Sequence, residues 1–309
     1  MDVSIVVVSY NVSDLLCACI ASVKKETTCK YEIIVVDNAS QDDSIKRLQA
    51  EHADIILIQN QSNVGFVRAN NQAFQISNGR YVFMLNPDTL VLDKAIDKLV
   101  QFMDEHPEGG GGGPKILNPD MSLQPNCHHF PTIFMRLIEH TGLNRRYPDV
   151  RLFGKEFMTY WSYNETKEVD WITGCSLILR REALEKVGNL DENYFMYSEE
   201  TDICYQLKKA GWKILFCPSA SIIHYGGKSS TSQTVEKHYF GAVIKHLYKS
   251  KYFFFKKNYS NVHCLILKTI DFIYYFLFYV KNLFRMNLKE RKIKLSYASS
   301  ILSIILFGK

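Results

Sequence analysis

The stretch of sequence that decides the fold runs from Tyr81 to Asp88 and reads YVFMLNPD. Its first five residues are apolar or aromatic, which is typical of a central strand that is covered on both faces of a sheet. Pro87 cannot donate a backbone hydrogen bond to a neighbouring strand, so the chain must leave the sheet there. The Asp88 carboxylate is therefore expected at the carboxyl edge of the strand, where open α/β sheets bind their ligands.

A second predicted strand ends in the same way. Residues 32–38 read EIIVVDN, and the carboxylate of Asp37 follows directly after the apolar run. The first hundred or so residues alternate strand-like and helix-like segments, which predicts a largely parallel sheet. Two carboxylates at the same edge of one sheet predict a site for a polar ligand, and they suit a hard cation.

The composition is that of a globular protein with ample material for a core. The chain has 309 residues, of which 47% are hydrophobic and 22% charged. The eight cysteines form no CxxC pair and several lie inside apolar runs, so buried reduced thiols are expected. The segment before the first predicted strand, which begins at Val3, does not resemble a secretory leader. Both observations lead us to expect a cytoplasmic protein.

Two segments are expected to lie outside the regular sheet. The five glycines of 109–113 lose much backbone entropy if they are ordered, so they predict an irregular connection and not a phosphate-binding loop. Residues 118–165 are rich in turns and aromatic side chains, which predicts a long excursion over the binding face. A nicotinamide-dependent oxidoreductase would need a glycine-rich turn after the first strand, and residues 9–12 read SYNV instead.

Seven segments together resemble the inverting glycosyltransferases of family 2, especially the rhamnosyltransferase-like branch. In the order of that family they are SIVVVSYN (4–11), VVDNAS (35–40), NVGFVRANN (63–71), LNPD (85–88), WITGC (171–175), EETD (199–202) and HYGG (224–227). The resemblance implies an α/β fold of the GT-A type, with a mostly parallel central sheet flanked by helices. It also implies that a sugar such as rhamnose moves from a nucleoside-diphosphate sugar to a hydroxyl of a surface glycan, which we expect to be lipid-linked.

The resemblance also assigns the donor side of the site. Asp37 matches the position that binds the nucleotide base, although Asp-Asn-Ala-Ser is also good turn chemistry. Asp88 matches the metal ligand of a reduced DXD motif, with His224 as a second ligand and Mg²⁺ or Mn²⁺ as the ion. The alternatives are a solvated turn residue for Asp88 and a structural histidine for His224. Residues 228–230 would close over the diphosphate. The other expected donor-binding residues are Ser9, Tyr10, Asn11, Asn38, Gly65, Arg68 and Asn86.

Inverting sugar transfer needs a carboxylate that removes the proton of the acceptor hydroxyl as its oxygen attacks the anomeric carbon. The family places this base in a paired acidic motif, which here reads Glu199-Glu200. By position, Glu200 is the base and Glu199 a supporting or acceptor-binding residue, while the reverse order stays open. Trp171 and Gly174 are expected to form the floor of the acceptor pocket, although a tryptophan on a strand also suits the core. A non-catalytic scaffold that binds nucleotide-sugars is the alternative function, and the intact acidic pair argues against it.

The sequence divides into a GT-A domain, 1–240, and a basic, aromatic helical tail, 241–309. Within the domain, 1–106 is expected to be the nucleotide-binding half and 107–240 the acceptor-binding half. From residue 251 onward, eleven lysines and arginines face only two acidic residues. No nucleic-acid-binding pattern accompanies this charge.

Within the tail, the longest uncharged apolar piece has nine residues, 272–280, whereas a bilayer span needs about 20. We therefore expect an interfacial helix, peripheral on the inner face of the cytoplasmic membrane. Packing on the catalytic domain, or on a second copy in a homodimer, is the alternative.

Overall fold

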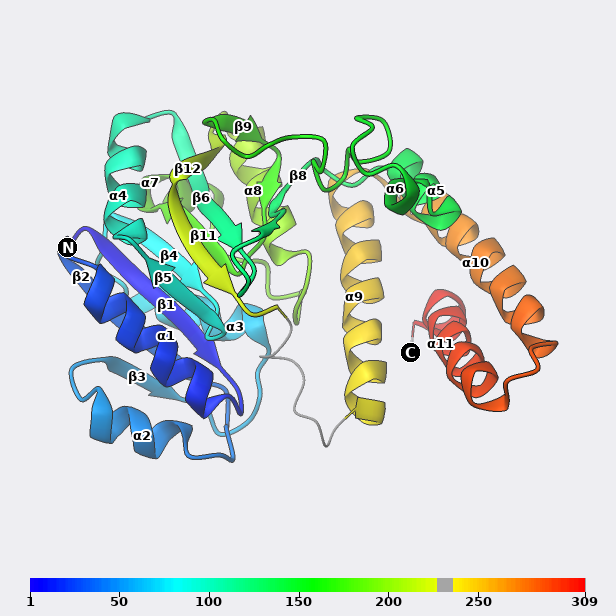
Figure 1. The fold of residues 1–309 in the computed structure, drawn as a ribbon, viewed down its shortest axis with the longest axis horizontal. Helices are drawn as coiled ribbons and strands as arrows, with labels where there is room; N and C mark the ends of the chain where they lie inside the picture. Colours follow the sequence, from blue (N-terminus) through cyan, green and yellow to red (C-terminus); the bar gives the residue numbers. More distant parts are fainter. Residues whose placement is uncertain (227–235, 309) are drawn as a thin grey trace.

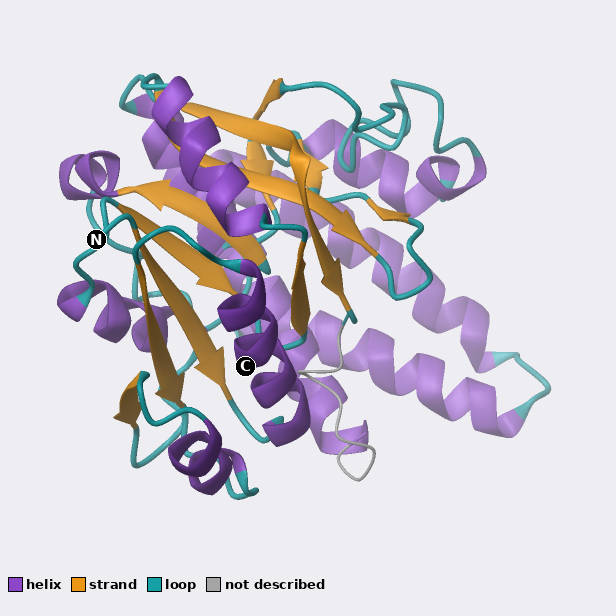
Figure 2. Ribbon diagram, turned by 60° about the vertical axis from the view of Figure 1, so that its left-hand side comes forward, coloured by secondary structure: helices purple, strands orange, loops and turns teal. Residues whose placement is uncertain are grey.

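The computed structural model describes residues 1–226 and 236–308, and its centre is a twisted sheet (Figure 1). Helices cover both faces of this sheet (Figure 2). The last helices of the chain extend to one side of it (Figure 1). The α/β class expected from the sequence is therefore confirmed.

The strands of the N-terminal half are all parallel to one another. They are β1 (Val3–Ser9), β2 (Tyr31–Asp37), β3 (Ile56–Gln59) and β4 (Tyr81–Leu85). β1 lies between β2 and β4, and β3 pairs with the outer side of β2. Ser9 lies opposite Asp37 in the register, so β1 and β2 end at the same edge. The intervening helices are α1 (Ser13–Glu26), α2 (Ser44–Glu51) and α3 (Phe66–Ile76).

The second half of the sheet is mixed. Its strands are β5 (Thr89–Leu92), β6 (Gly109–Leu117), β7 (Leu123–Gln124), β9 (Lys167–Val169), β11 (Ser176–Arg180) and β12 (Lys213–His224). The strand order is β3-β2-β1-β4-β11-β6-β12-β5, with β7 beside β6 and β9 beside β12. β11 is antiparallel to both of its neighbours, whereas β12 is parallel to β6. The short strands β8 (Cys127–His128) and β10 (Trp171–Ile172) form a separate pair.

The helices of this half surround the mixed part of the sheet and continue into the tail. They are α4 (Ala95–Glu105), α5 (Ile133–Thr141), α6 (Leu143–Arg146), α7 (Arg181–Val187), α8 (Glu199–Lys209), α9 (Glu236–Asn258), α10 (Asn261–Leu283) and α11 (Leu288–Phe307). α5, which lies in the excursion expected over the binding face, packs against α10 instead (Figure 1).

The prediction of an irregular connection at 109–113 is wrong, because all five glycines belong to the buried strand β6. Their neighbours occupy the space that side chains would need. A Cβ atom on Gly110 would lie 2.6 Å from the Cβ of Trp212, and one on Gly112 would lie 2.7 Å from the backbone oxygen of Leu215. The glycines are thus required by close packing inside the sheet, not by flexibility.

The hydrophobic core has two parts, one on each face of the sheet. Alternate residues of β1 point to opposite faces, so Ile5 and Val7 pack with α1 and α4, while Val6 and Val8 pack on the other face. The second part also contains Tyr248, Tyr252, Phe254 and Phe255 of α9. The first helix of the basic tail is therefore packed into the catalytic body.

A cluster of buried charge joins α10 to α5. Asp271 of α10 is fully buried, and its Oδ1 lies 2.6 Å from Nε of Arg136 and 2.7 Å from Nε2 of His140. Its other oxygen accepts a 2.9 Å hydrogen bond from the Tyr252 hydroxyl. Both carboxylate oxygens of Asp271 are thus satisfied within the protein.

Among the residues that the structure describes, α10 is the one helix long and apolar enough to cross a membrane by length and composition, with 23 residues and a mean hydropathy of 1.4. The nine uncharged residues 272–280 are too short a run to predict a helix of this length and hydropathy from the sequence. The fixed pairing of Asp271 with Arg136 nevertheless ties one face of α10 to the catalytic body.

Candidate active site

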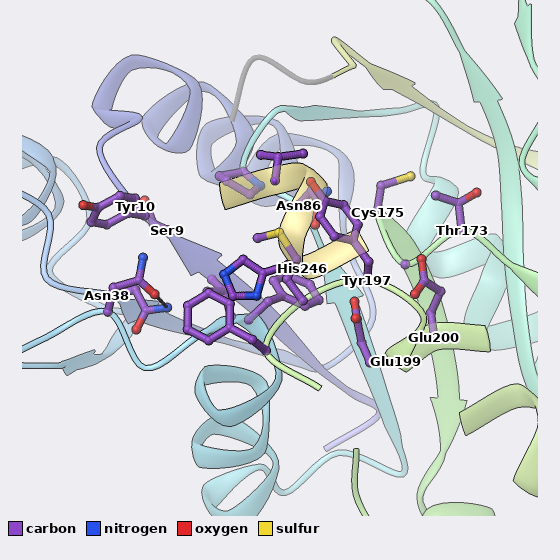
Figure 3. A pocket seen from close by; sticks show the side chains of 18 of the residues that line it. Ser9, Tyr10, Asn38, Asn86, Thr173, Cys175, Tyr197, Glu199, Glu200 and His246 are labelled. Carbon is purple, nitrogen blue, oxygen red and sulfur yellow. Dashed lines mark hydrogen bonds between the residues drawn. The ribbon is translucent and has the colours of Figure 1, made fainter. Parts of the chain in front are cut away.

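A cavity of about 590 Å³ opens at the carboxyl edge of β1 and β4 (Figure 3). Figure 3 shows Tyr10 and Asn38 on one side of it and Glu199 and Glu200 on the other. Several separate parts of the chain therefore meet here: the strand ends, the segment that leads into α3, the segment before β11, the segment that leads into α8, and α9. The lining residues are Val8, Ser9, Tyr10, Asn38, Asn63, Phe66, Asn86, Pro87, Thr173, Gly174, Cys175, Phe195, Met196, Tyr197, Glu199, Glu200, His224, Val243 and His246.

The ends of β1 and β2 carry buried polar atoms with unused hydrogen-bonding capacity. Ser9 and Asp37 are both fully buried. Within the described part of the chain, neither Oγ of Ser9 nor Oδ1 of Asp37 has a hydrogen-bond partner. The other oxygen of Asp37 accepts a 2.9 Å bond from the backbone N–H of Ser40. Asp37 thus stabilises the turn with one oxygen, while the other has no partner among the described residues, so the turn role does not rule out the expected ligand role.

Some expected donor-binding residues form hydrogen bonds that hold the loops around the cavity together. Oδ1 of Asn11 accepts a 2.7 Å bond from the N–H of Gln41, which ties two loops together. The Asn38 side chain donates to the backbone oxygen of Gly65 at 3.3 Å. Gly65 has φ = 91°, and a Cβ there would lie 2.7 Å from the Phe195 ring. Only glycine allows the loop that contains Gly65 and the segment that contains Phe195 to approach so closely.

Arg68 points elsewhere. Its side chain is 59% exposed, and its Nε lies 3.3 Å from Oε2 of Glu192. Asn86, in contrast, lines the cavity directly (Figure 3). Among the expected nucleotide-sugar-binding residues, those that line the cavity are Ser9, Tyr10, Asn38 and Asn86. Asp37 does not line it and is buried opposite Ser9 in the register of β1 and β2.

Asp88 and His224 come together although 136 positions separate them in the sequence. Asp88 is fully buried, and its Oδ1 lies 3.4 Å from Nε2 of His224. Nδ1 of His224 lies 2.7 Å from Oε1 of Gln124, which can only accept. In the neutral imidazole this contact puts the proton on Nδ1 and leaves the lone pair of Nε2 on the side of Asp88.

Two ligand atoms 3.4 Å apart can both reach one cation at bond lengths of about 2.1 Å. The residues present thus fit the divalent ion implied by the sequence.

The acidic pair begins α8 after a strained turn. Tyr197 and Ser198 have φ values of 70° and 65°, which residues with side chains rarely adopt. Glu199 is 4% exposed, and within residues 1–226 and 236–308 neither its Oε2 nor that of Glu200 has a hydrogen-bond partner. Strain and unsatisfied buried oxygens together are typical of functional sites.

Burial governs the protonation of the pair. Burial, and then the charge of Glu200, raise the pKa of Glu199 well above its usual value. Burial also raises the pKa of Glu200, although backbone N–H groups, including that of Gly174, act in the opposite direction. A Cβ on Gly174 would lie 3.3 Å from the Cβ of Glu200, so the glycine leaves room for this side chain.

Trp171 does not line the cavity. Its ring stacks on His128 with centroids 3.9 Å apart, and its Nε1 donates to the backbone oxygen of His129 at 3.1 Å. Thr173, Val243 and His246 line the cavity without having been expected from the sequence. Val243 and His246 lie on α9, beyond every motif, so no local pattern pointed to them. The expected diphosphate loop, 228–230, lies outside the residues that the structure describes.

The comparisons with known proteins agree with this geometry. The sequence model for "Glycosyl transferase family 2" matches residues 4–188, which is more than half of the chain. The N-acetylglucosaminyl-diphospho-decaprenol L-rhamnosyltransferase of Mycobacterium tuberculosis is 28% identical over 240 residues, which cover 73% of this chain and 76% of that protein.

Solved structures show the same fold. GalNAc-T7 with UDP, GalNAc and Mn²⁺ has a TM-score of 0.56 at 18% identity over 83% of this chain, although the match spans only 51% of GalNAc-T7. The mannosyltransferase PcManGT from Pyrobaculum calidifontis, in complex with GDP-Man and Mn²⁺, has a TM-score of 0.54 at 15% identity over 99% of this chain and 87% of its own. The fold is thus of the GT-A type expected from the sequence.

Proposed function

This chain belongs to glycosyl transferase family 2, and we propose that it is an inverting, metal-dependent enzyme that extends a lipid-linked glycan of the cell envelope. The observation that carries the proposal is a cavity whose lining brings the unsatisfied Ser9 hydroxyl at the end of β1 together with a glutamate pair that has unsatisfied oxygens. The similarity to a rhamnosyltransferase that acts on a diphospholipid-linked sugar supports rhamnose as the sugar and a lipid-linked acceptor.

In this reaction the donor lies over the strand ends and the acceptor hydroxyl lies against the glutamates. Asp37 and Ser9 offer hydrogen-bonding atoms to the nucleoside. Glu200 removes the acceptor proton as the acceptor oxygen forms a bond to the anomeric carbon and the bond to the diphosphate breaks. Asp88 and His224 would hold a divalent cation, which would supply positive charge for the leaving diphosphate. Mn²⁺ in GalNAc-T7 and PcManGT supports such an ion.

We assign the two halves of the domain accordingly. Residues 1–106 contribute the strand ends β1, β2 and β4 and so form the nucleotide-binding half. Residues 107–240 contribute Gly174, Glu199 and Glu200 and form the acceptor-binding half. Residues 241–309 form the helical tail, with α9 packed on the catalytic body.

The donor site is tested by thermal unfolding with a panel of uridine-, guanosine- and thymidine-diphosphate sugars, with and without Mn²⁺. A nucleotide at about 100 times its Kd should stabilise the protein by about 2.7 kcal/mol. Asp88→Asn keeps the shape of the side chain but removes its charge, so it should lose the Mn²⁺-dependent part of this stabilisation. The exposed Asp93→Asn is the matched control. Undiminished Mn²⁺-dependent binding by Asp88→Asn would contradict the metal assignment.

The tail supports a membrane-surface partner. The outward face of α10 is mostly apolar, interrupted by the exposed Thr269, and its exposed apolar residues include Val262, Leu265, Ile266, Ile273, Phe276 and Leu277. Exposed basic residues follow at the end of this helix and into α11, namely Lys281, Arg285, Lys289 and Lys292. Apolar insertion and positive charge together favour an anionic lipid surface. We therefore place the enzyme on the inner face of the cytoplasmic membrane.

Vesicle flotation tests this surface without truncation, because removing α10 would also break the Asp271 cluster. The double variant Leu265→Gln/Leu277→Gln should lose most binding to vesicles that contain anionic lipid. Ile56→Gln, on β3 at the far edge of the sheet, should bind normally. High salt should weaken wild-type binding in part. Unchanged vesicle binding by the double variant, or a loss of dimerisation in its place, would contradict the lipid assignment.

A further inference from the structure

The C-terminal half of α9 holds both ends of the segment that carries the acidic pair. Nζ of Lys257 donates to Oδ2 of Asp191 and to Oδ2 of Asp202, each at 2.7 Å. Nδ2 of Asn258 donates to the other oxygen of Asp202 at 2.6 Å. Asp191 is the first residue of the segment 191–202, and Asp202 is its last residue and lies in the first turn of α8. One lysine therefore joins the two ends of this segment.

The middle of the same segment also contacts α9. The Ser250 hydroxyl donates to the backbone oxygen of Met196 at 2.8 Å. The ring of His246 stacks on Phe195, with centroids 4.3 Å apart and planes inclined by 18°. The backbone oxygen of Phe195 in turn accepts from the N–H of Phe66 at 2.8 Å. α9 therefore follows the segment 191–202 from the cavity to its far end.

This segment needs such support, because its conformation is unfavourable by itself. It contains the left-handed turn at Tyr197 and Ser198, and Ser198 provides no side-chain cap for α8. It also directs two buried carboxylates of like charge into the cavity. A backbone of this kind persists only where the surrounding structure fixes it.

We propose that Lys257 is a positioning residue for sugar transfer, which fixes Glu199 and Glu200 in the cavity by bridging Asp191 and Asp202. It does not touch the reacting atoms, since it lies on the outer side of the segment with its side chain 29% exposed. It lies beyond residues 4–188, which the family model matches. The expected effect of Lys257 on turnover rests on the proposed function. Its expected effect on the order of residues 191–202 does not.

The test compares five full-length variants with the wild type, four single variants and one double variant. Lys257→Met removes the bridge, and Lys257→Arg restores a cation that can reach both carboxylates. Asp202→Asn weakens one end of the bridge, and the neighbouring exposed Lys256→Met is the matched control. Hydrogen–deuterium exchange without any substrate should be faster at the amides of 191–202 in Lys257→Met, while the amides of β1 and β2 stay unchanged.

Kinetics separate positioning from a merely structural role. With thymidine-diphosphate rhamnose and an N-acetylglucosaminyl diphospholipid acceptor, Lys257→Met should lower kcat by about 10- to 100-fold and leave the donor KM within about twofold. Lys257→Arg should recover most of the rate, and Lys257→Met/Asp202→Asn should be no worse than Lys257→Met alone.

Each outcome bears on one proposal. Normal exchange at 191–202 in Lys257→Met, or an unchanged kcat, overturns the positioning role. Equal losses of donor affinity and kcat that Lys257→Arg does not restore also overturn it, because they indicate general destabilisation. If the wild type transfers no sugar but Lys257→Met still loosens 191–202, the proposed donor or acceptor is wrong and the structural bridge stands.

Discussion

Two regions in the described part of this molecule treat their buried carboxylates in opposite ways. Asp271, between α10 and α5, has Arg136, His140 and Tyr252 around its two oxygens. Burial alone would raise the pKa of Asp271, but the hydrogen bond from His140 and the charge of Arg136 hold it below its usual value. At the cavity, Glu199 and Glu200 face each other with unsatisfied oxygens, and their pKa values are raised.

The comparison shows that burial of a charge does not by itself indicate function. What distinguishes the cavity is that the protein compensates its buried carboxylates only in part: backbone N–H groups lower the pKa of Glu200, but Oε2 of each glutamate has no hydrogen-bond partner among the described residues. The Asp271 cluster, fully compensated, joins two helices. Breaking each cluster should therefore have different consequences.

The largest expected effect is on stability at the Asp271 cluster. Arg136→Met leaves the Asp271 carboxylate without its strongest partner, and the free energy of unfolding should fall by about 3–5 kcal/mol. Urea titration measures this loss. Arg145→Met, at an exposed position nearby, should change stability by less than about 0.5 kcal/mol. A loss below about 1 kcal/mol for Arg136→Met would show that the cluster is not held as tightly as the contacts indicate.

The next effect is on turnover at the cavity. Glu200→Gln removes the proposed base but keeps the shape of the side chain, so transfer should fall by about 10²-fold or more while nucleotide binding persists. Single-turnover assays and nucleotide titration measure the two properties separately. If Glu199→Gln reduces transfer more than Glu200→Gln does, the order of base and supporting residue is reversed.

The pH dependence of turnover should be smaller but diagnostic. A base must be deprotonated, so kcat should rise about tenfold per pH unit on the acid side of the profile. Because the pair has raised pKa values, this limb should lie above the value of about 4.3 for an exposed glutamate. Glu199→Gln removes a like charge and should shift the limb to lower pH. A limb at the ordinary glutamate value would show that the pair is solvated in the active enzyme.

The smallest expected effect is a gain in stability. In the folded state the pKa of Glu199 is raised, so its unfavourable contribution is absent at pH values below the unfolded-state value of about 4.3 and grows as the pH rises toward the folded-state value. Glu199→Gln should therefore stabilise the protein by about 1 kcal/mol at pH 8 and by almost nothing at pH 4. Chemical denaturation at the two pH values measures the difference, and destabilisation at pH 8 would contradict it.

Local patterns predicted much of the N-terminal half correctly. The apolar run 81–85 and its Asn-Pro-Asp ending placed β4 in the sheet, because strand ends in a parallel sheet obey short-range rules. The glycines of 109–113 misled for a physical reason. A run of glycines is flexible by itself, but here the side chains of Trp212 and Ile172 pack against these glycines and hold them in the strand.

The site was only partly predictable. Motifs brought out Asp88, His224 and the glutamate pair, because each carries chemistry that a cavity of this kind needs. The contributions of His246 and Lys257 depend on how a helix beyond the motifs packs against a loop 50 or more residues earlier. No property of the residues around them in the sequence shows that packing.

The apolar outer face of α10 has a consequence for how the rate of this enzyme should be expressed. Under the proposed function, in which that face lies on a bilayer and the acceptor is lipid-linked, the enzyme and its acceptor would share a two-dimensional phase. Their encounters then depend on the mole fraction of acceptor in the surface and not on its amount per volume of solution. Added neutral lipid should dilute the acceptor and slow transfer at constant bulk composition, while the nucleotide-sugar, which arrives from water, should keep an ordinary concentration dependence.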